Sequence, residues 1–97
     1  MAKGYWITCY RSISDPGVLA EYARLAVPPI QAGGGRFLVR GLPTRAFEAG
    51  VAQRTVIIEF DSVEQALATY EGPAYQAALR VLEGAVERDV RFVEGAA

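Results

Sequence analysis

Three features of the 97-residue sequence predict an α+β fold. Four segments alternate apolar with polar residues, or are rich in β-forming side chains, as strands do. Two further segments carry apolar residues at helical spacing behind good helix-start signals. Their order is strand, helix, strand, strand, helix, strand, which is a split β-α-β unit written twice. The sequence therefore predicts a ferredoxin-like sandwich, in which a four-stranded antiparallel sheet carries both helices on one face.

The first half of the chain predicts a strand, a helix and a second strand. Residues 4–11 are rich in β-forming side chains, and Asp15-Pro16 supplies a helix cap and a proline at the first helical position. Pro28-Pro29 lacks amide hydrogens, so we expect the helix to stop or kink near Val27. Three glycines then lead into a strand over residues 36–41.

The second half begins with a long loop and continues with a strand and a helix. Residues 42–53 have no sustained periodicity, and loops of this length often border a functional site. Residues 54–60 are predicted to form a strand antiparallel to the preceding one. Ser62 and Gln65 form a capping box at the start of the second helix.

The end of the chain restarts a helix and closes the sheet. Gly72-Pro73 interrupts the second helix, and the last strand is predicted over residues 87–93. With 52% hydrophobic and 22% charged residues, residues 1–97 have the composition of one folded domain. The apolar face of the restarted segment consists of Tyr75, Leu79, Leu82 and Val86.

Composition argues against several classes of protein. The net charge is -1 and no run is rich in lysine and arginine, so a nucleic-acid partner is not expected. No apolar run approaches the length of about 18 residues that a membrane span needs, and the start does not resemble a signal peptide. The sequence therefore predicts a cytoplasmic protein without a membrane partner.

The cysteine and histidine counts limit the chemistry. Cys9 is the only cysteine and there is no histidine, so no internal disulfide can form and a metal site is not expected. Without a histidine to activate it, Cys9 is predicted to be a buried, inert thiol. The glycines at 33–35 follow a helix and open a strand, which is the reverse of a phosphate-binding loop. We expect no cofactor.

One face of the predicted sheet has no helices to cover it. On simple strand alternation, that face includes Leu38 and Ile57 beside Arg36, Arg40 and Glu59. A half-apolar open face of this kind is usually covered by a second copy of the same chain. The sequence therefore predicts a homodimer in which two sheets face each other.

Arg40 and Glu59 lie on adjacent predicted strands and supply two alternative interpretations. They form either a structural salt bridge inside the dimer or a catalytic pair. In the catalytic interpretation Arg40 holds a carboxylate or enolate, and Glu59, with its pKa raised by burial, accepts a proton. Arg36 and Arg54 could add binding contacts, although Arg54 could also be a solvated charge at the end of a strand.

Aromatic residues offer further candidates for a site. Trp6 and Phe37 could form a flat wall for a planar ligand, and Tyr75 is the preferred phenolic donor because it follows the break at Gly72-Pro73. The alternative for each tyrosine is a core position with its hydroxyl at the edge. Asp89 could act as a base, but pairing with an arginine is the plainer expectation. The other tyrosines considered as donors are Tyr5, Tyr22 and Tyr70.

An ordered set of motifs resembles the bacterial family known as domain of unknown function 1330. That resemblance implies a member of the dimeric α/β-barrel superfamily, whose members include cofactor-independent monooxygenases, small isomerases and ligand-binding regulatory modules. The chain departs from the family pattern at Gly72, where a serine, aspartate or asparagine is usual. The segments that carry the resemblance are Gly4-Tyr5-Trp6-Ile7, Gly34-Gly35-Arg36-Phe37-Leu38-Val39-Arg40-Gly41, Glu59-Phe60-Asp61-Ser62 and Gly72-Pro73-Ala74-Tyr75-Gln76.

Two classes of function remain open from the sequence. The first is a cofactor-independent enzyme or binding protein for a small anionic or aromatic metabolite, with Arg40, Glu59 and Tyr75 as its central residues. The second is a structural or regulatory ligand-binding dimer without chemistry. An enclosed cavity of a few hundred Å³ lined by these groups would favour a ligand.

Overall fold

The strands and helices follow the predicted order. The computed structural model describes residues 2–96, and the α+β, ferredoxin-like fold class is confirmed. Three antiparallel pairings join the strands in the order β2-β3-β1-β4. The elements are β1 (Gly4–Ile13), α1 (Pro16–Ala32), β2 (Arg36–Gly41), β3 (Thr55–Phe60), α2 (Val63–Glu71), α3 (Pro73–Leu79), the short 3₁₀ turn η1 (Arg80–Leu82) and β4 (Val86–Glu94).

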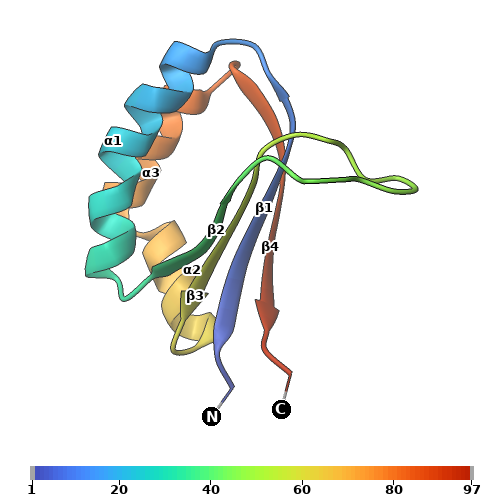
Figure 1. Cartoon of the computed structure of the whole chain (residues 1–97). Helices are drawn as coiled ribbons and strands as arrows, with labels where there is room; N and C mark the ends of the chain where they lie inside the picture. The colour runs from blue at the N-terminus through green and yellow to red at the C-terminus, as the bar shows by residue number, and fades with distance from the viewer. Residues whose placement is uncertain (1, 97) are drawn as a thin grey trace.

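All three α-helices lie on one face of the sheet and leave the opposite face open (Figure 1). We call the face of the sheet that carries no helix the open face. The connection between β2 and β3, residues 42–54, contains no regular strand and extends as an arm well beyond the open face (Figure 1). We call this segment the arm.

The core lies between the sheet and the helices and is strongly aromatic. Trp6, Phe60 and Tyr75 are the largest fully buried side chains. The Trp6 ring meets Tyr75 edge-on at 4.8 Å between centroids, and it also contacts Tyr70 and Phe92. Edge-to-face aromatic pairs add stabilisation beyond their buried area, so Trp6 is the centre of this core.

Of the two expected effects of Pro28-Pro29, a kink or a stop near Val27, the stop is wrong, because α1 continues through both prolines to Ala32. Ile30, one residue beyond them, is 2% exposed and belongs to the core. The amides of Gly33 and Gly35 donate to the carbonyls of Pro29 and Ile30, at 3.0 and 2.9 Å. Burial and these bonds hold the last turn in place despite the amide hydrogens that the prolines lack.

The helix caps behave largely as predicted. Asp15 accepts from the amides of Gly17 and Val18, and Ser62 accepts from the amide of Gln65 at 3.1 Å. The Gln65 side chain donates to the carbonyl of Gly33 instead of completing the capping box. It therefore links α2 to the end of α1. Gly72 provides no side-chain cap for α3.

A β-bulge in β2 changes which residues face the helices. Phe37 pairs with Ile58, but the next pair is Val39 with Ile57, so Leu38 is an extra residue. Because side chains alternate along a strand, one extra residue reverses the faces of all that follow. Arg40 consequently turns to the helix-covered face.

Candidate functional site

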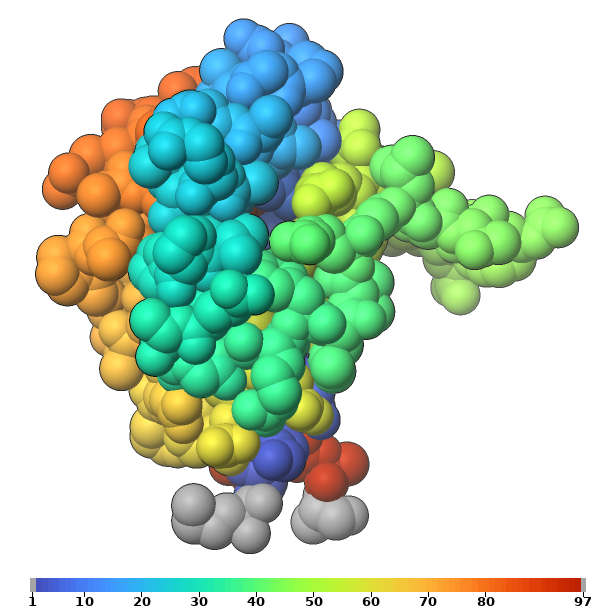
Figure 2. All heavy atoms as spheres, turned by 60° about the vertical axis from the view of Figure 1, so that its left-hand side comes forward, coloured from blue at the N-terminus to red at the C-terminus, as the bar shows by residue number. Residues whose placement is uncertain are grey.

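The candidate site is a cavity between α1 and the helix-covered face of the sheet. It has a volume of about 40 Å³ and communicates with solvent. Figure 2 shows the hollow between α1, in blue to cyan, and the green to yellow residues at the base of the arm. Its walls are formed by Trp6, Thr8, Tyr10, Leu19, Tyr22, Ala23, Ala26, Val27, Ile30, Phe37, Arg40, Arg54, Val56, Ile58 and Arg88.

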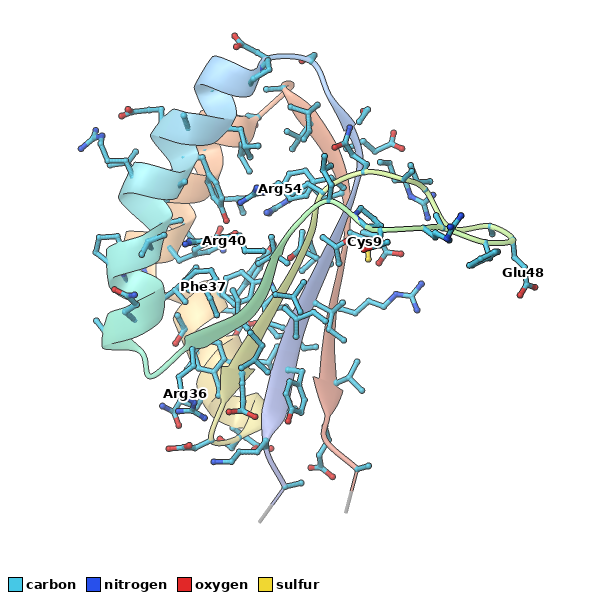
Figure 3. The ribbon with its side chains drawn as sticks, viewed as in Figure 1. Cys9, Arg36, Phe37, Arg40, Glu48 and Arg54 are labelled. Atoms are coloured by element: carbon cyan, nitrogen blue, oxygen red, sulfur yellow. The ribbon has the colours of Figure 1, made fainter. Side chains whose placement is uncertain are left out.

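Three arginines reach this cavity from three different strands or strand ends. The bulge in β2 directs Arg40 toward it, and Arg54 precedes β3 at the base of the arm. Figure 3 shows both side chains between the sheet and α1. Arg88 lies on β4, opposite Tyr10, on the same face. The tertiary structure therefore brings together charges that are far apart in the sequence.

Arg88 is held by two tyrosines. Its terminal nitrogens donate to the hydroxyls of Tyr22 at 3.5 Å and Tyr75 at 3.3 Å, and those hydroxyls lie 2.7 Å apart. The guanidinium also lies 5.5 Å from the ring centroid of Tyr10. Burial raises the pKa of both Tyr22 and Tyr75, so both phenols are neutral at physiological pH and can donate a hydrogen bond.

The walls of the cavity contain no acidic side chain. Within residues 2–96, the ion pairs do not include Arg40, Arg54 or Arg88. Arg40 instead lies over the ring of Phe37, at 4.6 Å from its centroid. Arginine remains protonated in proteins, so the cavity carries positive charge that no neighbouring carboxylate neutralises.

Two buried donors in the cavity walls have no hydrogen-bond partner. They are the indole Nε1 of Trp6 and the Nε of Arg54, and they are the only such side-chain atoms in the described part of the chain. Leaving a buried donor unpaired costs free energy, so native proteins usually provide a partner. Both residues line the cavity, but the two unpaired atoms themselves are buried away from its surface.

The predicted pairing of Arg40 with Glu59 is wrong. Glu59 faces the open side, where it accepts from the hydroxyl of Tyr5 at 2.9 Å and pairs with Arg36 at 3.1 Å. The hydrogen bond from Tyr5 and the pairing with Arg36 lower the pKa of Glu59, the opposite of the predicted upward shift. The bulge explains the error, because it places Arg36 and Arg40 on opposite faces.

The Glu59 network predicts acid-sensitive stability. A lowered folded-state pKa contributes stability that is fully present above the unfolded value, about 4.3, and is lost as the pH falls through the folded value. The decline in melting temperature below about pH 4.3 should therefore be shallower for Glu59→Gln than for the unmodified protein. Thermal unfolding between about pH 3 and pH 7 measures this slope. Exposed Glu71 provides the matched control, Glu71→Gln, which should keep the original slope. An unchanged slope in Glu59→Gln would contradict the assignment.

The other predicted site residues separate into two groups. Trp6, Phe37, Arg40 and Arg54 line the cavity, and Tyr75 contributes through its hydroxyl contacts with Tyr22 and Arg88. On the open side, Arg36 and Tyr5 both belong to the Glu59 network, so neither lines the cavity.

The predictions for two further residues of the open side, Asp89 and Cys9, can also be compared with the structure. Asp89 is paired with Arg91 and Arg11, as the plainer expectation had it. Cys9 is exposed, so the expectation of a buried thiol is wrong for the single chain; it lies on the side of the sheet away from the helices (Figure 3). The exposure follows from strand alternation, because the neighbours of Cys9 along β1 occupy the core-facing positions.

Arg88 is the main residue that sequence reasoning missed. It alternates with Val86, Val90 and Phe92, all of which are partly buried against the core. A charged residue at an alternating position otherwise filled by apolar, core-facing residues needs a partner or a ligand. The sequence alone shows this alternation. Tyr22 is among the tyrosines predicted as donors, but its contact with Arg88 joins residues 66 positions apart and depends on tertiary packing.

Other classes of site receive no support within residues 2–96. No group of three or more histidine, cysteine, aspartate or glutamate side chains there is placed to hold a metal ion. Among the helices described, none combines the length and the apolar character needed to cross a membrane.

Solved structures of low sequence identity share the fold. A protein of unknown function from Rhodopseudomonas palustris is 16% identical, with a TM-score of 0.74 over 99% of this chain and 84% of that chain. A protein from Nitrosomonas europaea, provisionally described as an antibiotic biosynthesis monooxygenase, is 18% identical, with a TM-score of 0.63 over 96% of this chain and 89% of that chain. A dimeric ferredoxin-like protein of unknown function from Bacteroides fragilis is 13% identical, with a TM-score of 0.59 over 96% and 94% of the two chains.

The comparison with family models identifies the chain more directly than these structures do. A search of curated proteins finds no match to this sequence. The model for the domain of unknown function DUF1330 matches residues 3–96, which is nearly the whole chain. Together with the shared fold, this match shows that the chain belongs to the DUF1330 family.

Proposed function

We propose that this protein binds a small anionic metabolite in the cavity beneath α1, as a binding protein or as a cofactor-independent enzyme. The observation that carries the proposal is the meeting of three arginines without an acidic partner at one cavity. Guanidinium groups bind carboxylate and phosphate oxygens through pairs of parallel hydrogen bonds. An anion would supply acceptors for Arg40, Arg54 and Arg88 together.

The size of the cavity limits how much of the ligand it encloses. A water molecule needs roughly 10–15 Å³ of such volume, so about 40 Å³ holds three or four atoms of that size. That is much less than the few hundred Å³ expected for a whole metabolite. The acidic group of the ligand would occupy the cavity, and any aromatic or aliphatic body would extend toward solvent past Arg40, which is exposed.

Removing Arg54 is expected to weaken anion binding at least about tenfold, because a hydrogen bond to a charged group contributes about 1.5–3 kcal/mol. Isothermal titration with acetate, benzoate and phosphate compares the unmodified protein with Arg54→Gln. The matched control is Arg24→Gln, since Arg24 is an exposed arginine paired with Glu21 on the outside of α1. The absence of binding for all three anions, or equal binding by Arg54→Gln, would contradict the proposal.

The open face favours a second proposal, that two copies of the chain associate through it. Within the described residues, none of the large exposed hydrophobic side chains lies on a helix. Figure 1 shows that the arm extends past the open face, so a second copy lying on that face would also meet the arm. The exposed side chains are Leu38, Val39, Leu42, Phe47, Val51 and Val93.

A homodimer is expected to have about twice the 10.5 kDa mass of the single chain by light scattering. Leu38→Asp, which puts a charge on the apolar surface, should shift the mass toward the monomer. Cys9 is a natural probe, because it is exposed on the open face of a single chain. Thiol labelling of Cys9 should be slow in the dimer and fast in Leu38→Asp. A monomeric unmodified protein would contradict this proposal without affecting the anion site.

A further inference from the structure

The positive charge of the cavity exceeds what a monoanion can neutralise. Arg40, Arg54 and Arg88 contribute three guanidinium groups, and no carboxylate lines the walls. Arg54 and Arg88 are half-buried and Arg40 is exposed, so a single carboxylate would leave one half-buried guanidinium without a counter-charge, and unbalanced charge away from water is costly. The charge count therefore favours a ligand with at least two negative charges.

The strand register places these charges at two sides of the cavity. Tyr10 on β1 pairs with Arg88 on β4, and the amide of Tyr10 donates to the carbonyl of Arg54 at 2.9 Å. The backbones of Arg54 and Arg88 therefore lie on either side of Tyr10, two strand spacings or about 10 Å apart across the sheet. Arg40 lies on β2, opposite Val56 and on the Arg54 side.

Both sides offer hydrogen-bond donors suited to oxygen atoms. On one side, Arg54 and Arg40 line the cavity, and the ion pairs within residues 2–96 include neither. On the other side, Arg88 lies beside the hydroxyls of Tyr22 and Tyr75. Trp6, a residue that is 1% exposed, also lines this cavity. Donors therefore surround the cavity, and acidic acceptors are missing from its walls.

We propose that the cavity selects a compact dianion, meaning a short dicarboxylate or a phosphate group, over a monoanion of similar size. This inference rests on the proposed anion-binding function and specifies its ligand class. The Arg54 side and the Arg88 side each bind oxygen atoms of the same ligand. The cavity volume of about 40 Å³ holds three or four atoms of water size, which is enough for one carboxylate of malonate or most of a phosphate group.

Isothermal titration with acetate, malonate and inorganic phosphate, at one pH near 7 and one ionic strength, tests the selection. Malonate or phosphate should bind at least about tenfold more tightly than acetate, because the second charge engages a second guanidinium. Tight binding of malonate alone identifies a dicarboxylate, and tight binding of phosphate alone identifies a phosphoryl group. Equal affinity for all three would overturn the dianion inference and leave the anion site standing. Binding of none would overturn both.

Substitutions on the two sides provide the second test. Arg54→Gln and Arg88→Gln should each reduce the preference for the dianion to nearly the acetate level. Arg88→Lys keeps the charge and should retain part of the preference, which distinguishes lost charge from a folding defect. Arg24→Gln remains the surface control. A dianion preference that survives in folded Arg54→Gln or folded Arg88→Gln would contradict the two-sided arrangement.

Discussion

Replacing Trp6 with alanine is expected to lower the free energy of unfolding by about 3–5 kcal/mol. Trp6 is 1% exposed, stacks near Phe60 and meets the edges of Tyr70 and Tyr75. Alanine would leave a void at the centre of the aromatic core, and the surrounding strands could close it only in part. A loss of this size is a large fraction of the 5–15 kcal/mol that typically stabilises a domain.

Urea unfolding followed by circular dichroism, at one protein concentration, measures the effect of Trp6→Ala. Trp6 is the only tryptophan, so its fluorescence cannot follow this variant. Trp6→Phe retains an aromatic ring and should lose less, about 1–2 kcal/mol. The control Phe47→Ala removes an aromatic side chain that is 73% exposed in the arm, and it should change the stability of the single chain by less than about 0.5 kcal/mol. A similar effect for Trp6→Ala and Phe47→Ala would contradict the central role of Trp6.

Replacing Gly4 with alanine is the second change with a large expected effect. An added Cβ at Gly4 would overlap the backbone of Ser62 and Val63, where α2 begins. Backbone atoms cannot move aside as a flexible side chain does, so either β1 or the start of α2 must shift. Overpacking of this kind typically costs about 1–3 kcal/mol, and displacement of the Ser62 cap would add to it.

Gly41→Ala is the matched control for Gly4→Ala. A Cβ at Gly41 would meet no atom within 4 Å, and its backbone does not require glycine. The control should therefore keep the original stability or gain slightly, because alanine reduces the freedom of the unfolded chain. Melting temperatures of the two variants, measured side by side, provide the comparison. An equal melting temperature for both would contradict the close approach of β1 to α2.

Local patterns in the sequence predicted most of the fold. The caps at Asp15 and Ser62, the glycines before β2 and the break at Gly72-Pro73 appear at the predicted positions. Each depends on a few neighbouring residues, so the sequence contains the relevant information locally. The end of α1 differs, because distant contacts of Ile30 outweigh the local effect of Pro28-Pro29.

The candidate site was predicted only in part. The sequence singled out Arg40, Arg54, Trp6 and Phe37, and all four line one cavity. Simple alternation along residues 36–41 also predicts that Arg40 shares a face with Glu59, which holds only for a strand without a bulge. The bulge at Leu38 changes the face on which Arg40 lies, and no local pattern in residues 36–41 marks its position.

The sequence by itself determined the order of the elements and the caps of the helices. It also determined a composition that supplies arginines and contains no histidine. Only the tertiary structure decided which of those arginines meet, because Arg40, Arg54 and Arg88 come together through strand pairing between distant segments. Side-chain alternation has a period of two residues, so one bulge separates Arg40 from Glu59. Packing of α1 on the sheet places Tyr22 beside Arg88, across 66 positions of the sequence.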